Sequence, residues 1–166
     1  MAINDIRIIS TGGVDSLPEM TYQTEANATQ VLPGVLVKGK STGSPYVIAL
    51  ADGDGVIGTT TQILGLATST DTRTASVDGT VRVARINANT VLRCKAKTAA
   101  NIDTAAELLA IAGDYYVIDV TTDVHTMDLA GGHNLANAFV ATGTGDIAKS
   151  ELDFTVRATA LMGPVA

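Results

Sequence analysis

Short stretches in which apolar and polar residues alternate run through most of this chain. The clearest are residues 79–84 and residues 91–97, where apolar side chains recur at every second position. This period is typical of a β-strand with one buried face, because successive side chains point to opposite sides of the strand. The polar residues 87–90 between the two stretches indicate a turn, so we expect the stretches to pair as a hairpin.

Further short apolar runs predict additional strands, since each is followed by turn-forming residues such as Gly, Pro, Asn or Asp. One run, residues 31–38, is interrupted by a Pro-Gly turn. Another, residues 46–51, leads into the strong turn signal Asp-Gly-Asp-Gly at residues 52–55. The remaining runs are residues 63–67, 115–120, 138–141 and 153–157.

One helix is predicted, over residues 104–112. Thr104 and Glu107 have the spacing of a capping box, in which each side chain bonds to the backbone N–H of the other residue. The residues that follow are good helix formers. Gly113 comes where a helix commonly ends in a left-handed residue.

Many short strands with one short helix predict a mainly β fold, a compact sandwich or barrel-like domain. We expect this β-rich domain to span residues 31–166, with a subdivision near residue 113 as an alternative. Residues 1–30 contain many polar residues and little periodicity, which indicates an extended N-terminal arm that orders against a partner. The alternative for this region is a first strand followed by a long loop.

Composition and charge narrow the function classes. Aromatic residues make up 4% and there is no Trp, so the core must consist of Val, Ile, Leu and Ala. The net charge of −6 does not indicate a nucleic-acid binder. No apolar run approaches the roughly 18 residues that a membrane span needs. The N-terminus carries an acid where a signal peptide has a positive charge, so we expect synthesis in a cytoplasm and no membrane partner.

Basic residues gather in residues 79–102, a window that contains no Asp or Glu. Five of the chain's eleven basic residues lie there and are called the basic strip below: Arg82, Arg85, Arg93, Lys95 and Lys97. The strip is either a ribbon that faces an acidic partner, such as an acidic region of another copy of this chain, or a solvated sheet face that discourages edge pairing. Cys94 lies on the apolar side of residues 91–97 and is expected to be a buried, unreactive thiol.

Candidate catalytic or metal-binding residues are few. His125 and His133, with Asp128 between them, match no zinc spacing and would need a further ligand. We therefore expect two loop or surface histidines, and an enzyme that uses these three residues is a minor alternative. A Gly-x-Ser-x-Gly nucleophile motif is absent from the sequence. The sequence therefore predicts no enzyme and no catalytic, cofactor or metal-binding residue.

Two further motifs fail on their context. The calcium-loop pattern that starts at Asp52 has Val56 and Ile63 where ligands are needed, so a turn is the better interpretation. Residues 143–148 match the dinucleotide fingerprint Gly-x-Gly-x-x-Ala. Only 18 residues follow, which leaves no room for the helix and second strand of that unit, so we expect a loop.

Three stretches between residues 34 and 83 carry a family resemblance. They are a Gly-Val-Leu-Val strand at residues 34–37, a small-residue strand that ends in residues 63–69, and a Gly-led alternating strand at residues 77–83. With a composition rich in Thr, Ala, Val and Gly behind a polar N-terminal region, this pattern resembles the head decoration, or cement, proteins of tailed bacteriophages. The resemblance covers about half of the chain and does not include the predicted helix or the residues after Tyr115.

The resemblance implies a compact β-tulip-like domain, often a homotrimer, on the outer surface of the virion. The implied partners are the major capsid protein and other copies of the chain, and binding would follow expansion of the capsid and stabilise it against the pressure of internal DNA. The family has no catalytic motif to carry over. The alternative is a receptor-binding or adhesin module of a phage fibre, against which the four Tyr, two Phe and missing Trp argue.

Overall fold

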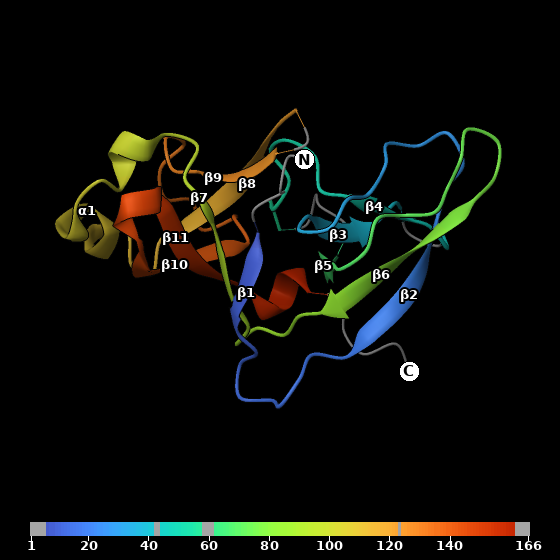
Figure 1. Cartoon of the computed structure of the whole chain (residues 1–166). Coiled ribbons are helices and arrows are strands. Elements are labelled where there is room, and N and C mark those ends of the chain that lie inside the picture. Colours follow the sequence, from blue (N-terminus) through green and yellow to red (C-terminus); the bar gives the residue numbers. More distant parts are fainter. Residues whose placement is uncertain (1–5, 42–43, 58–61, 123, 162–166) are drawn as a thin grey trace.

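The computed structural model describes residues 6–41, 44–57, 62–122 and 124–161. In these residues the chain forms eleven strands in two antiparallel sheets, one short α-helix and three 3₁₀ helices (Figure 1). The prediction of a mainly β fold with one helix is confirmed.

The two sheets use different parts of the chain. Sheet A has six strands in the order β1 (Arg7–Ser10), β7 (Val91–Lys95), β11 (Glu151–Val156), β10 (Phe139–Asp146), β8 (Tyr115–Thr121) and β9 (Val124–Asp128). Sheet B has five, in the order β2 (Glu19–Thr24), β6 (Gly79–Arg85), β5 (Ile63–Ala67), β3 (Leu36–Gly39) and β4 (Val47–Ala49). The chain crosses from sheet B to sheet A between β6 and β7, and strands on both sides of residue 113 lie in sheet A.

Each sheet is curled, so that strands far apart in the strand order come close to one another. In sheet B, a parallel bridge between Gln23 and Tyr46 links β2 to the residue before β4. In sheet A, a parallel bridge between Ala96 and Met127 links the end of β7 to β9. Both sheets are therefore barrel-like, which reduces the exposed edge that each presents. Strand β1 lies outside the closure of sheet A and pairs with the first part of β7.

Apolar side chains fill the interior of each curled sheet and the space between the two sheets. Sheet B encloses a valine-rich cluster of Val31, Val35, Val37, Val47, Leu64, Ala67, Val81 and Val83. Leu36, Leu50 and Ile63 belong instead to a larger cluster that sheet B shares with sheet A. In this larger cluster Phe139 and Phe154 meet edge to face, with ring centroids 5.7 Å apart. Burial of each large apolar side chain contributes about 1.5–3 kcal/mol, so the shared cluster holds the sheets together.

The Asp-Gly-Asp-Gly sequence after β4 also joins the two sheets. The N–H of Gly53 donates to the carbonyl of Ile118 at 3.0 Å, and the N–H of Ile118 donates to the carbonyl of Asp54 at 3.2 Å. The carbonyl of Gly55 accepts from the N–H of Ala138 at 2.6 Å. Since Ile118 lies on β8 and Ala138 directly precedes β10, the sequence that indicated a turn connects sheet B to sheet A.

The predicted N-terminal arm requires a correction. Strand β1 pairs with β7, with Arg7 opposite Arg93, and all six residues of β2 pair with β6. The described part of residues 1–30 thus contributes one strand to each sheet, and residues 1–5 lie outside the described residues. Four of the six side chains of β2 are exposed and only Thr24 is buried, so the strand has no continuous buried face.

The predicted hairpin between residues 79–84 and 91–97 is wrong. The turn exists, since the N–H of Thr90 donates to the carbonyl of Asn87 at 3.0 Å. However, β6 pairs with β2 and β5, whereas β7 pairs with β11 and β1. Other strands therefore pair with both edges of β6 and both edges of β7. The turn at residues 87–90 is the connection that leads the chain from sheet B to sheet A.

The helix α1 (Ala105–Ala110) begins at the predicted capping box. The hydroxyl of Thr104 accepts from the N–H of Glu107 at 3.2 Å, and the N–H of Thr104 donates to the Glu107 carboxylate at 3.0 Å. Gly113 follows the helix with a φ of 83°, in the left-handed region that was predicted for it.

We expect Thr104→Ala to lower the free energy of unfolding by about 1 kcal/mol, because it removes the acceptor for an unpaired helix N–H. Urea denaturation measures this change. Thr98 precedes a 3₁₀ helix and makes no side-chain cap bond, so Thr98→Ala should cost less than about 0.5 kcal/mol. Equal losses in the two variants would contradict a specific role of the capping box.

Candidate functional site

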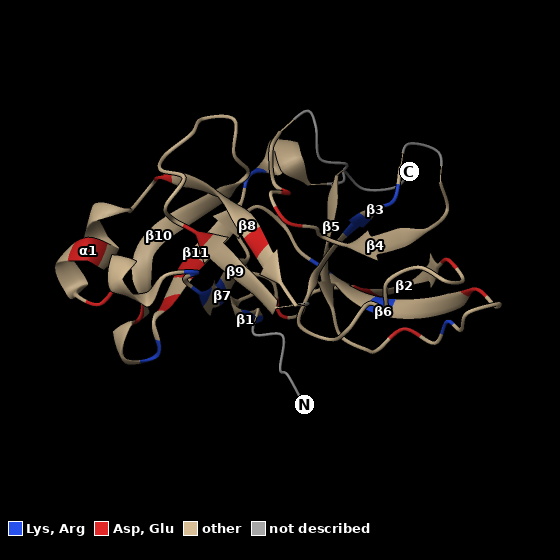
Figure 2. Ribbon diagram, turned by 90° about the horizontal axis from the view of Figure 1, so that it is seen from above, with Lys and Arg blue, Asp and Glu red and all other residues tan. Residues whose placement is uncertain are grey.

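Carboxylates of the same chain pair with three members of the basic strip, Arg82, Arg93 and Lys97. Arg93 donates to Asp153 with an Nε–O distance of 2.5 Å. Lys97 Nζ lies 2.6 Å from an Asp119 oxygen and 3.4 Å from an Asp128 oxygen. Figure 2 shows acidic and basic ribbon segments next to one another around β7 and β11. Neither sequence interpretation, an acidic partner or a solvated face, included these partners within the chain.

Two carboxylates on β11, those of Asp153 and Glu151, are nearly buried, with 4% and 3% of their surface exposed. Burial raises the pKa of Asp153, but hydrogen bonds from Arg93 and Thr144 outweigh it, and the pKa lies below its usual value. The guanidinium of Arg7 lowers the pKa of Glu151 against the effect of burial. The ion pair between Arg7 and Glu151 therefore holds β1 on sheet A, in addition to the backbone hydrogen bonds between β1 and β7.

Cys94 is buried on the side of β7 opposite Arg93, as the alternation predicted. Burial raises the pKa of the Cys94 thiol. Because the thiolate is the reactive form, Cys94 is an unreactive core residue at neutral pH.

The candidate set His125, Asp128 and His133 does not come together. His125 and Asp128 lie on opposite faces of β9, because side chains alternate along a strand. His125 is only 1% exposed, whereas Asp128 accepts a hydrogen bond from Lys97. His133 lies in the loop after β9, where its Nδ1 accepts from the N–H of Tyr115 at 3.2 Å. The expectation of a loop or surface histidine is right for His133 and wrong for His125.

Among the described residues, no group of three or more His, Cys, Asp or Glu side chains could hold a metal ion. The fingerprint-like residues 143–148 are also not the predicted loop. Residues 143–146 complete β10, and the 3₁₀ helix η2 (Ile147–Lys149) then leads into β11. A phosphate site of the dinucleotide type requires a longer helix at this point.

Exposed apolar side chains occur along residues 9–20, called the N-terminal apolar segment below. Ile9 on β1, Val14 in the connection and Met20 on β2 are 43%, 45% and 45% exposed. The connection is bonded to the body of the protein, because the carbonyl of Pro18 accepts from the last residue of β6 at 2.8 Å. The pairing of β1 with β7 and of β2 with β6 therefore holds the two ends of this segment in place.

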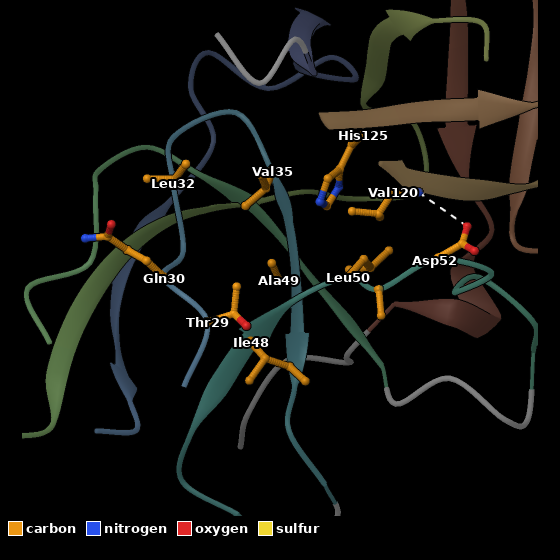
Figure 3. Close-up of a pocket in the computed structure, with 11 residues that line it drawn as sticks. Thr29, Gln30, Leu32, Val35, Ile48, Ala49, Leu50, Asp52, Val120 and His125 are labelled. Carbon is orange, nitrogen blue, oxygen red and sulfur yellow. Dashed lines mark hydrogen bonds between the residues drawn. The ribbon is translucent and has the colours of Figure 1, made fainter. Parts of the chain in front are cut away.

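A pocket of about 340 Å³ lies between the two sheets (Figure 3). Val35, Leu50 and His125 are buried and form its floor. Val120 and His125 come from sheet A, and the other lining residues come from sheet B and its connections. The walls and rim consist of Thr29, Gln30, Leu32, Ile48, Ala49, Ala51, Asp52 and Val120.

Hydrogen bonds hold both sides of this pocket. The Asp71 carboxylate accepts from the N–H of Val31 at 2.7 Å and anchors the connection that precedes β3. On the opposite side, the N–H of Leu50 donates to a carbonyl of β3 at 2.9 Å. The N–H of Val120 donates to Oδ1 of Asp52 at 3.4 Å, the bond that is dashed in Figure 3. The pocket is therefore built into the fold, as most ligand pockets are.

No protein-family model, curated protein or solved structure matches this chain. No helix in the described ranges is long and apolar enough to span a membrane.

The sequence interpretation missed the pocket and the N-terminal apolar segment. The pocket combines residues 29–35, residues 48–52 and the β8–β9 hairpin, whose proximity no local pattern reveals. His125 gave the one usable signal, because it alternates in register with Met127, which lies in the core. For the N-terminal apolar segment, the signal was apolar residues in a region that is otherwise polar.

Proposed function

We propose that this chain is a structural protein that decorates and stabilises a bacteriophage capsid. In this role it binds the outer surface of the major capsid protein lattice, as a homotrimer. The observation that carries the proposal is the N-terminal apolar segment. It exposes three large apolar side chains, two of them on strands that the sheets hold in place. A preorganised apolar surface loses little conformational entropy on binding, which suits a protein that acts through its interfaces.

The arrangement of sheet B also supports the proposal. The three stretches that resemble decoration proteins contribute β3, β5 and β6. These strands are neighbours in sheet B, in the order β6, β5, β3. The resemblance thus falls on one continuous piece of sheet rather than on scattered segments.

The test combines Ile9→Glu, Val14→Glu and Met20→Glu in one variant and measures co-sedimentation with expanded, empty shells of the major capsid protein of its phage. We expect at least about tenfold weaker binding, because charges would replace apolar contacts at the interface. The melting temperature should change little, since all three side chains are largely exposed.

The control introduces the same kind of charge at two other exposed positions. Leu109 and Leu135 are 68% and 70% exposed and lie outside the N-terminal apolar segment. The Leu109→Glu and Leu135→Glu double variant should bind shells like the parent chain. Undiminished binding by the N-terminal variant would refute the role of this segment, and equal losses in both variants would refute its specificity.

A further inference from the structure

We propose that the pocket between the sheets binds a small organic cation with an apolar body, such as a primary amine that carries an aromatic or branched aliphatic group. This goes beyond the proposed capsid role and does not depend on it. The volume of about 340 Å³ lies within the range of small-molecule sites. Apolar side chains supply most of the inner surface, with Val35 and Leu50 on the floor and Ile48 on the wall (Figure 3).

Charge at the rim selects for a cation. Asp52 is the only Asp, Glu, Lys or Arg among the described residues that line the pocket. It also interacts with Asp119, which pairs with Lys97, and Lys97 pairs with Asp128 as well. These three carboxylates have one ammonium group between them, so negative charge remains at the rim beside Asp52. An ammonium group is stabilised beside this carboxylate, whereas a carboxylate or phosphate group is repelled.

One polar side chain interrupts the apolar floor. The ring of His125 extends between Val35 and Val120 toward the pocket (Figure 3), and 99% of its surface is covered by the protein. Because His125 is covered in this way, the directional contacts for a bound molecule come from Gln30 and Thr29 at the rim.

The experiment titrates the full, isotope-labelled chain with three probes that share a phenylethyl body and differ in charge: phenethylamine, 2-phenylethanol and 3-phenylpropionate. Amide chemical shifts report which residues respond. We expect saturable shifts at lining residues such as Leu50 and Val120, with the amine binding tightest. The acid should bind about fivefold more weakly than the amine. A single rim charge changes the binding affinity by about tenfold at most.

Two variants separate charge from fit. Asp52→Asn keeps an oxygen for the Val120 N–H and should weaken the amine about threefold while leaving the alcohol unchanged. Asp103→Asn, an exposed carboxyl beside α1, should change neither. Ala49→Leu fills the pocket and should abolish the shifts with all three probes.

Three outcomes would overturn the proposal. The first is that the amine produces no saturable shift at the lining residues. The second is that the acid binds as tightly as the amine. The third is that Asp52→Asn leaves the ratio of amine to alcohol affinity unchanged.

Discussion

The variant Gly55→Ala is expected to lose about 3–5 kcal/mol of stability, a large part of the total for a domain of this size. Gly55 has a φ of 108°, where a residue with a Cβ is strained by about 1–3 kcal/mol. The added Cβ would also lie 2.3 Å from a ring carbon of Phe139. Phe139 is fully buried against Phe154, so its ring cannot move without disrupting the core, at a further cost of about 1–3 kcal/mol.

The neighbouring Gly53 provides the matched control. It also has a positive φ, 74°, but no atom lies within 4 Å of the Cβ that alanine would add. Gly53→Ala should therefore cost only about 1–2 kcal/mol, the backbone contribution alone. Urea denaturation of both variants measures the difference. A Gly55→Ala variant that is no less stable than Gly53→Ala would show that residues 52–55 do not pack on Phe139 as described.

The variant Asp153→Ala is expected to lose about 3–5 kcal/mol, because it leaves the guanidinium of Arg93 without its partner in a largely buried position. Thr144 loses a hydrogen bond at the same time, since its hydroxyl donates to Asp153 at 2.8 Å. Replacement of both partners, as Arg93→Met with Asp153→Leu, removes the unpaired charge and should recover most of the lost stability.

The same carboxylate makes the fold sensitive to acid. The pKa of Asp153 is lower in the folded chain than the value of about 3.9 in an unfolded chain. Its contribution is therefore fully present above that unfolded value and is lost as the pH falls through the folded pKa. Unfolding at pH 7 and in steps below pH 4 should show a steeper acid loss for the parent than for the double variant. Equal acid slopes, or no loss of stability in Asp153→Ala at pH 7, would contradict the ion pair.

Local patterns predicted most individual elements. The run at residues 63–67 matches β5, and the capping box marks the start of α1, because a short apolar run and a capping box depend only on nearby residues. Pairing could not be predicted in the same way. The turn at residues 87–90 indicated a hairpin, but the free edges of β6 and β7 were already taken by strands from distant parts of the chain.

The candidate sites were less accessible to sequence reasoning. The basic strip looked unpaired because its carboxylates lie far away in sequence, with Asp153 60 residues from Arg93. The pocket also depends on distant segments, because it forms only when β9 places His125 beside Val35, the residue before β3. Strand β2 escaped notice because it has no continuous buried face, whereas a first strand near the N-terminus was kept as an alternative.

The proposed capsid role can be tested most directly by adding the purified chain to expanded and to unexpanded shells of the major capsid protein encoded in the same genome and measuring bound copies by co-sedimentation. We expect saturable binding to expanded shells, at a ratio set by the three-fold positions of the lattice, and a trimeric mass for the bound protein. Binding that does not saturate, or that is equally weak on both kinds of shell, would contradict the proposed function.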